Sequence, residues 1–270
     1  NEIAIIDLHT HTKNSPDGNH EALFMAETAR DNKIHTVAFT DHCEVDYFYS
    51  DNYDKVVENS YRDVSLVAEK LKGQINILKG VELAQPHYIP ELAEKIINTY
   101  DYDVVIGSIH NLRNQEDFYN WKSFDGIDIE ATMNEYFDEL IKMLEWGNFE
   151  ILAHITYPFR YIFNHCGYIE DIDKYKSKVD ELLKLCAEKD KALEINMGGL
   201  KYPINKPSPD VETIKRYKEL GGKLISVGSD SHYAERIGVN IDKAYDIARA
   251  AGFKSVATFK DRKVSEFAIV

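Results

Sequence analysis

Seven short apolar runs recur along the chain, and a segment with helical periodicity follows each of them. The runs are predicted strands at 3–9, 36–39, 75–78, 104–109, 150–153, 192–195 and 224–227. The predicted helices lie at 21–32, 53–71, 89–98, 130–145, 172–189, 210–220 and 241–251. This alternation predicts an α/β protein with a parallel sheet and helices outside it. An open doubly wound sheet and a closed barrel both fit the pattern.

The composition limits the size of the core and the kind of partner. With 270 residues, 44% of them apolar, the chain can bury one substantial core, and we expect residues 1–270 to form a single domain. Its formal charge of −14 would repel a polyanion, so broad nucleic-acid binding is not expected. No apolar run approaches the roughly 18 residues of a membrane span, and no signal peptide is recognisable. Since its three cysteines are unpatterned, we expect a cytoplasmic protein.

Imidazole and carboxylate side chains follow most of the apolar runs directly. The first run ends in His9 and His11, which point to the same side of a strand because they are two residues apart. The full set of candidates is His9, His11, Asp17, Asp41, His42, Glu82, His110, His154, Asp230 and His232. Any one of them could be a hydrogen-bonded structural residue. Chance, however, would scatter histidines over helices and loops instead of placing six of the ten at strand ends.

The distribution of these residues over six of the seven strand ends favours the barrel. In a barrel the C-terminal ends of all strands face one mouth, where such enzymes place their sites. In an open sheet, strand ends so far apart could not converge on one ion cluster. Imidazole together with carboxylate suits zinc, iron or manganese. Because the candidates are too many for one tetrahedral ion, we expect two or three ions that share a bridging carboxylate.

Six motifs in chain order resemble those of the polymerase and histidinol phosphatase (PHP) family. They are Asp7-Leu8-His9-Thr10-His11-Thr12, Thr40-Asp41-His42, Gly80-Val81-Glu82, Gly107-Ser108-Ile109-His110, Ala153-His154 and Gly228-Ser229-Asp230-Ser231-His232. The resemblance covers essentially the whole chain. Within the family, the length, the Ser15-Pro16-Asp17-Gly18 turn and the Pro158-Phe159-Arg160 segment are similar to the stand-alone histidinol-phosphate phosphatases. The resemblance implies a distorted (β/α)7 barrel with a trinuclear metal centre at the C-terminal strand ends.

Carried over position by position, the resemblance implies three groups of metal ligands. The first ion would be held by His9, His11, Glu82 and Asp230, and Glu82 would bridge to a second ion held by His110 and His154. Asp17, His42 and His232 would hold the third ion. Many relatives carry a histidine where Asp17 stands, so here the third group gains an oxygen ligand. Asp7 and Asp41 do not match ligands, and we expect them to orient imidazoles.

The resemblance also implies a reaction, the hydrolysis of L-histidinol phosphate in histidine biosynthesis. A water that bridges two ions would be acidified from a pKa of about 15.7 to about 7 and would attack phosphorus in line. Arg160, in the predicted loop after the fifth strand, would bind phosphoryl oxygens because its planar fork matches phosphate. Arg113 is a second candidate for this contact. Asp17 or His42 would protonate the leaving oxygen, and Asp17 could do so only if its pKa is raised.

Other functions fit parts of the same pattern. A phosphoesterase for nucleotides or oligonucleotides and a phosphotyrosine-protein phosphatase would use the same metal chemistry. A non-catalytic metal-binding module should have lost several ligands, whereas every motif position here carries a competent one. An amidohydrolase-like C–N hydrolase usually carries a lysine bridge between its metals, but Glu82 stands at the bridge position. Glu44 and the segment Tyr47-Phe48-Tyr49 are plausible contacts for a histidinol moiety.

Overall fold

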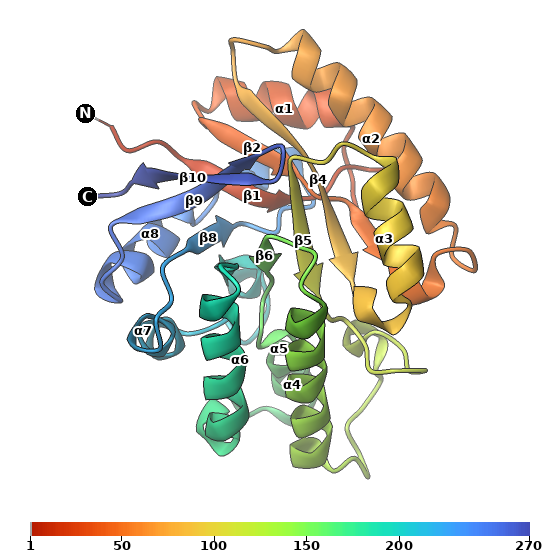
Figure 1. Cartoon of the computed structure of the whole chain (residues 1–270), viewed down its shortest axis with the longest axis vertical. Coiled ribbons are helices and arrows are strands. Elements are labelled where there is room, and N and C mark those ends of the chain that lie inside the picture. The colour runs from red at the N-terminus through yellow and green to blue at the C-terminus, as the bar shows by residue number, and fades with distance from the viewer. Residues whose placement is uncertain (1) are drawn as a thin grey trace.

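The computed structural model describes residues 2–270, in which parallel strands run in the order β1-β2-β4-β5-β6-β7-β8 (Figure 1). These strands are β1 (Ile6–Thr10), β2 (Thr36–Phe39), β4 (Asn76–Ala84), β5 (Val104–Ser108), β6 (Ile151–Leu152), β7 (Ala192–Asn196) and β8 (Ile225–Gly228). A short additional strand, β3 (His42–Glu44), pairs with the end of β4. The structure has the predicted distorted (β/α)7 barrel.

Backbone hydrogen bonds between the first and last barrel strands join the two edges of the sheet. The Asp230 amide donates to the His9 carbonyl at 2.9 Å, and the His11 amide donates to the Ser231 carbonyl at 2.8 Å. Both bonds lie at the C-terminal end of β1 and just beyond that of β8. The closure therefore occurs at the end of the barrel where the predicted ligands lie.

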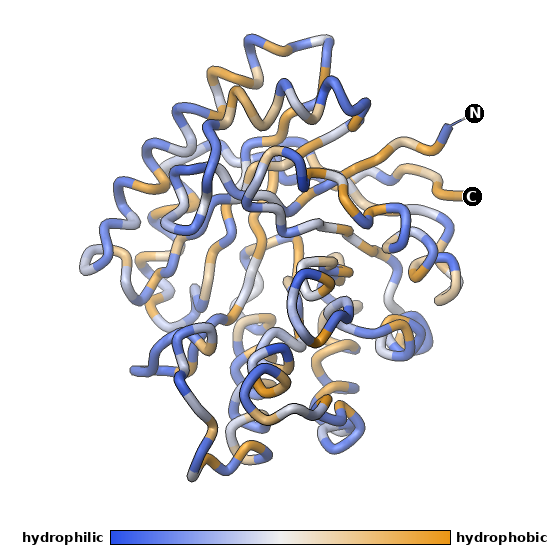
Figure 2. Tube along the Cα trace, turned by 180° about the vertical axis from the view of Figure 1, so that it is seen from behind, coloured by the Kyte–Doolittle hydropathy of each residue, from blue (hydrophilic) through white to orange (hydrophobic). Residues whose placement is uncertain are grey.

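Helices surround the strands and bury one face each. They are α1 (Ala22–Asp31), α2 (Tyr53–Lys70), α3 (Pro90–Thr99), α4 (Ile129–Trp146), α5 (Tyr157–Cys166), α6 (Lys176–Glu188), α7 (Val211–Glu219) and α8 (Ile241–Ala250). In α4 the buried residues include Met133, Tyr136, Phe137 and Leu140, which recur at helical spacing and form one stripe. Figure 2 shows the same division, with apolar residues along the central strands and alternating character along the helices.

A C-terminal hairpin covers the end of the barrel opposite the predicted ligands. Its strands, β9 (Ser255–Lys260) and β10 (Lys263–Ala268), pair antiparallel. In the turn between them, the Arg262 amide donates to the Asp103 carbonyl at 2.8 Å and the Arg262 side chain pairs with Glu150. Asp103 and Glu150 lie just before β5 and β6, so the hairpin is fixed to the N-terminal strand ends. The barrel is thus closed at this end and open at the other.

The segment after β6 differs from the prediction. It was predicted as a long loop that carries Arg160 and His165, but it forms helix α5. Pro158 is typical of a helix start as well as of a loop, because a proline is tolerated in the first helical turn, where its missing N–H is not needed. Gly167 ends the helix with a φ of 76°. Arg160 therefore stands on a rigid element.

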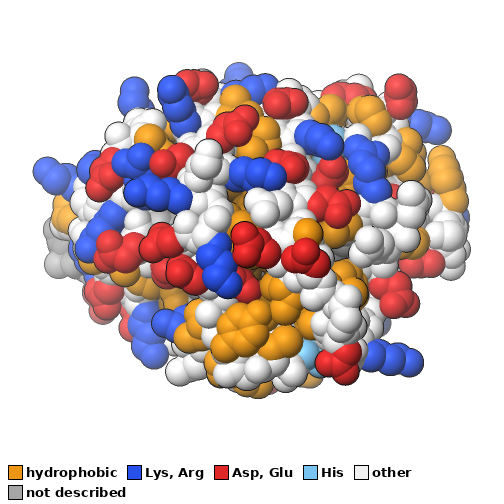
Figure 3. Space-filling model, turned by 90° about the horizontal axis from the view of Figure 1, so that it is seen from below, with side chains coloured by type: hydrophobic (Ala, Val, Ile, Leu, Met, Phe, Trp, Pro, Cys, Tyr) orange, Lys and Arg blue, Asp and Glu red, His pale blue; other side chains and the backbone are white. Residues whose placement is uncertain are grey.

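The surface agrees with the mixed charge of the sequence. In the face drawn in Figure 3, Lys and Arg side chains are interspersed with Asp and Glu around one apolar patch. This face therefore offers a polyanion no continuous basic surface. None of the helices described in residues 2–270 combines the length and the apolar character needed to cross a bilayer.

Candidate metal centre

The predicted ligands converge at the open mouth of the barrel. His9 and His11 belong to β1 and the residues after it, and the other ligands come from β3, β4 and the segments after β1, β5, β6 and β8. The structure brings together His9, His11, Asp17, His42, Glu82, His110, His154, Asp230 and His232. Ligand atoms of His9, His11, Glu82 and Asp230 lie together, as the resemblance implied, whereas His11 also lies with His42 and His232, and His42 with Glu82 and His110. The contacts are described below in the order of the three implied groups.

Four side chains face one another in the first group. His9 Nε2 lies 2.8 Å from Glu82 Oε1, and His11 Nε2 lies 3.0 Å from Asp230 Oδ1. Asp230 has a φ of 57°, a left-handed conformation that costs a non-glycine residue energy and is typical of functional sites. Gly228 packs against His9, and a Cβ added at Gly228 would stand 2.5 Å from His9 Cβ. A larger residue at position 228 would therefore displace this ligand.

Glu82 connects the first group to a second. Its Oε2 lies 2.8 Å from His110 Nε2 and 3.3 Å from His154 Nε2. Although Glu82 is fully buried, Oε2 receives no hydrogen bond of good geometry from residues 2–270. A buried carboxylate oxygen without such a bond is costly unless a cation neutralises it. The donor set of both groups, imidazole nitrogen with carboxylate oxygen, therefore fits divalent transition-metal ions.

Asp17, His42 and His232 form the third group, at the rim of the mouth. Asp17 Oδ2 lies 3.0 Å from His232 Nε2 and 3.4 Å from His42 Nε2. His42 also faces inward, with its Nδ1 3.4 Å from Glu82 Oε1. The third group is thus in contact with the bridging carboxylate.

The charges of the third group set the protonation of its members. Burial would raise the pKa of Asp17, but the positive charge of His42 and the hydrogen bond from His232 hold that pKa well below its usual range. Burial would lower the pKa of His42, but the carboxylates of Asp17 and Glu82 raise it to about 10. The raised pKa that Asp17 needs for proton donation is therefore absent in the protein as described, and His42 carries the proton of this pair.

Two buried carboxylates outside the predicted ligand set contact the ligand imidazoles. Glu194 Oε2 lies 2.5 Å from His9 Nδ1, and the oxygens of Glu44 lie 2.9 and 3.1 Å from His110 Nδ1. A carboxylate on one ring nitrogen fixes the ring and directs the other nitrogen toward a metal. The sequence reasoning missed Glu194, although a charged residue inside an apolar strand was an available signal. From the sequence, Glu44 is expected only as a contact for the substrate.

Asp7 and Asp41 have a different role from the predicted one. Neither contacts an imidazole in the described residues, so the expectation that they orient ligand rings is wrong. Asp7 accepts hydrogen bonds from the amide and hydroxyl of Ser229, at 2.9 and 2.5 Å. Asp41 accepts from the amide and hydroxyl of Thr12, both at 2.7 Å, and from the hydroxyl of Ser15, also at 2.7 Å. These carboxylates hold the backbone segments that carry ligands.

A cavity of about 660 Å³ opens over the three groups, and Arg160 lies in its wall. Arg160 is 6% exposed, and its Nη2 has no hydrogen-bond partner in residues 2–270. Its guanidinium lies 5.3 Å from the ring centre of Tyr157 and 4.8 Å from that of Tyr202. Aromatic faces fix the guanidinium without neutralising its charge. Lys201, which was not predicted, also lines the cavity, with its Nζ 3.5 Å from the Asp230 carbonyl oxygen.

Arg113 lies elsewhere, which corrects its predicted contact with substrate. Its Nε is 3.6 Å from Glu139 Oε2, and its guanidinium stacks over Tyr88 at 4.3 Å from the ring centre. Arg113 is not among the described residues that line the cavity. The position of Arg113 in the loop after the fourth strand could not reveal this, because the loop directs the side chain toward α4.

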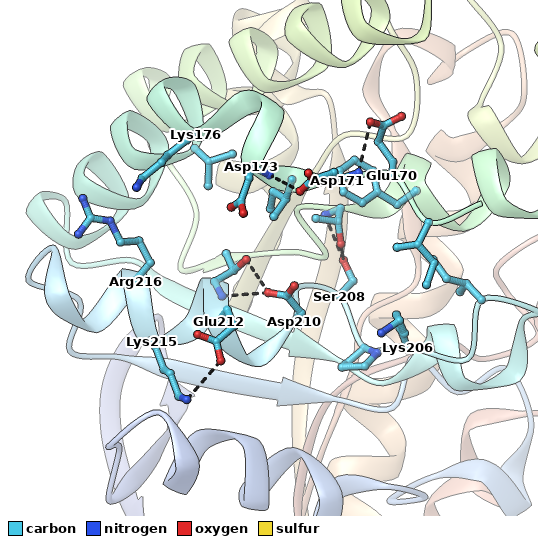
Figure 4. Close-up of a pocket in the computed structure, with 18 of the residues that line it drawn as sticks. Glu170, Asp171, Asp173, Lys176, Lys206, Ser208, Asp210, Glu212, Lys215 and Arg216 are labelled. Carbon is cyan, nitrogen blue, oxygen red and sulfur yellow. Dashed lines mark hydrogen bonds and ion pairs between the residues drawn. The ribbon is translucent and has the colours of Figure 1, made fainter.

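A second cavity of about 570 Å³ lies between α5, α6 and α7. Figure 4 shows that its acidic residues serve local structure: Asp210 accepts from the Thr213 amide at the start of α7, and Glu212 pairs with Lys215. Likewise, Asp180 pairs with Arg216 at 2.9 Å. No group of potential metal ligands was found among the described residues of this cavity. The cavity over the ligand groups is therefore the candidate active site.

Comparisons with known proteins agree with this fold. A curated protein named "Probable histidinol-phosphatase", from Clostridium acetobutylicum, is 28% identical over 98% of this chain and 100% of its own length. The histidinol-phosphatase of Lactococcus lactis subsp. lactis is 25% identical over 97% of this chain and 96% of that protein. These relatives match this chain over nearly their whole length.

Solved structures give the same fold. The crystal structure of histidinol phosphate phosphatase from Lactococcus lactis subsp. lactis, complexed with zinc, L-histidinol and phosphate, matches with a TM-score of 0.80. The match covers 98% of this chain and 100% of that chain at 23% sequence identity. The family model of the PHP domain matches residues 7–198 of this chain, a span that includes ligands from all three groups. The chain therefore belongs to the PHP domain family.

Proposed function

We propose that this protein is a metal-dependent phosphatase that hydrolyses L-histidinol phosphate to L-histidinol and inorganic phosphate. The observation that carries the proposal is the shared cavity, in which an unneutralised arginine faces three groups of metal ligands. Arg160 suits the phosphoryl group because a guanidinium binds two oxygens at once. The Lactococcus lactis relative, which was solved with L-histidinol and phosphate, supports the choice of substrate.

The charges along the cavity wall support a zwitterionic substrate. Two cations, Arg160 on α5 and Lys201, lie in the wall contributed by the segments after β6 and β7. Acidic residues line the wall contributed by β3 and the segments after it and after β5, namely Glu44, Asp51, Glu116 and Asp117. A phosphate ester of a cationic alcohol can place its phosphoryl group at the first wall and its ammonium at the second. Histidinol phosphate has this distribution of charge.

We assign the three ligand groups to two or three zinc, iron or manganese ions. When bound, such ions would acidify a water to give a nucleophile at neutral pH and would offset charge on the phosphoryl oxygens. Arg160 would hold the phosphoryl group, and its ring contacts with Tyr157 and Tyr202 would keep the guanidinium oriented. Of the two residues in contact at the rim, Asp17 and His42, only His42 carries a proton, so His42 is the residue that could pass a proton to the leaving oxygen.

The substrate assignment is tested by phosphate release. We expect zinc-loaded protein to hydrolyse L-histidinol phosphate with a kcat/KM at least ~100-fold above the values for AMP and phosphotyrosine, because AMP brings no ammonium to the acidic wall and phosphotyrosine brings a carboxylate beside its ammonium. A chelated sample should lose the activity. A preference for AMP would contradict the histidinol assignment and leave the phosphatase chemistry intact. No release from any ester by protein that holds zinc would contradict both.

A further inference from the structure

Strand β7 contributes no predicted metal ligand, yet two of its polar side chains lie inside the metal centre. Glu194 and Asn196 are 1% and 0% exposed. Because they are two residues apart in a strand, both point to the same side, which here is the barrel interior. Neither has a place in the three ligand groups. Buried polar side chains need hydrogen-bond partners, and the partners of Glu194 and Asn196 include candidate metal ligands.

Both carboxylate oxygens of Glu194 accept hydrogen bonds from residues of the first two ligand groups. Its Oε2 accepts from His9 Nδ1 at 2.5 Å, and its Oε1 accepts from the His154 backbone amide at 3.0 Å. With a hydrogen held on Nδ1, Nε2 is the His9 atom left to bind a metal ion, and it lies 2.8 Å from Glu82 Oε1. Glu194 therefore fixes the tautomer that a metal ion requires of His9.

Asn196 orients Asp230, on the other side of the first ligand group. Its Nδ2 donates to Asp230 Oδ2 at 3.1 Å and to Glu194 Oε1 at 2.9 Å. Its Oδ1 accepts from the Gly198 amide at 2.9 Å, which orients the amide group. With Oδ2 engaged, Asp230 turns Oδ1 toward His11 Nε2, 3.0 Å away. Since Asp230 has a strained backbone, this contact helps to keep its side chain in place.

We propose that Glu194 and Asn196 are positioning residues that set the metal affinity of the first ligand group, His9, His11, Glu82 and Asp230. The inference rests on the proposed metal centre and adds residues to it. The imidazoles of the third group have other partners, since His232 Nδ1 donates to the Asp230 carbonyl oxygen at 2.9 Å and His42 Nδ1 lies 3.4 Å from Glu82 Oε1. Loss of Glu194 should therefore weaken the first group and leave the third group unchanged.

The test is zinc binding to metal-free protein, measured by competition with a chromophoric chelator. Glu194→Gln keeps the shape of the side chain, but its amide NH₂ must face at least one of three N–H donors. We expect the affinity for one zinc ion to fall by about 10- to 100-fold, the usual cost of losing such a partner. The affinity for an ion in the third group should stay within about twofold of the unmodified protein.

Glu139→Gln is the matched control. Glu139 is equally buried and pairs with His87 Nε2 at 2.8 Å, but it lies on α4 outside the cavity. This variant removes a buried glutamate–histidine pair and should bind zinc like the unmodified protein. If folded Glu194→Gln does the same, the inference is overturned. If Glu194→Gln does not fold, Asn196→Ala tests the same group, and unchanged zinc affinity of that variant overturns the inference. An unmodified protein without zinc affinity would instead overturn the proposed metal centre.

Discussion

Glu82→Gln is expected to lower kcat/KM for phosphate release by about 1000-fold or more, equivalent to ~4 kcal/mol of transition-state stabilisation. Glu82 contacts imidazoles of the first and second groups through different oxygens, with His9 Nε2 and His110 Nε2 both 2.8 Å away. Burial alone would raise its pKa, but the charges of His9 and His110 hold that pKa well below the usual range. A neutral amide would remove the negative charge that lies between the two groups, and it could not present a carboxylate oxygen to each of them.

Metal content separates this effect from a general loss of structure. The Glu82→Gln protein should retain fewer zinc ions per chain than the unmodified protein after dialysis, as measured by elemental analysis. Glu150→Gln is a suitable control, because Glu150 is a carboxylate at the opposite end of the barrel, where it accepts from the Val105 amide at 2.9 Å. The control should retain its zinc and its activity. A Glu82→Gln protein with normal zinc content and normal rate would show that Glu82 is not a bridge.

Arg160→Ala is expected to lower kcat by about 10²- to 10³-fold, the usual cost of removing one donor that stabilises charge in the transition state. Arg160 is buried and has no ion-pair partner in the described part of the chain, so its charge is available to an incoming phosphoryl group. Arg160→Lys should recover only part of the loss, because an ammonium cannot bind two oxygens in parallel. Steady-state kinetics with L-histidinol phosphate measure both variants.

Zinc content and a second arginine provide the controls for this prediction. Arg160 contacts the rings of Tyr157 and Tyr202, so its loss should leave the zinc content unchanged, in contrast to the loss of Glu82. Arg113→Ala should alter kcat by less than about twofold, since Arg113 pairs with Glu139 away from the cavity. A rate for Arg160→Ala within tenfold of the unmodified protein would contradict the assignment of Arg160 to the phosphoryl group.

The sequence was sufficient to predict the barrel and the ligand positions. The reason is physical: in a barrel, the residue that follows each buried strand must lie at one common mouth, so strand ends alone place His9, Glu82 and His154 together. These predictions depend on periodicity and strand direction, which a single sequence displays. The division of the ligands among three groups comes instead from the resemblance to the PHP family.

The errors concern contacts that depend on side-chain direction. The segment of helix α5 is predicted as a loop, whereas it is helical, with Pro158 in the first turn of the helix. Asp7 was assigned to imidazoles, but it accepts from Ser229, which lies 222 positions away in the sequence. Glu194 likewise accepts from the ring of His9, which lies 185 positions away in the sequence. No local sequence pattern predicts which distant group a buried carboxylate will contact.

The most direct test of the central account is a zinc titration of metal-free protein in which bound zinc and phosphate release from L-histidinol phosphate are measured on the same sample. The account predicts no release without metal and a rate that rises as the first and second ligand groups fill. Saturation should occur at two or three ions per chain. Full activity in protein shown to be free of metal, or saturated zinc sites without phosphate release, would contradict it.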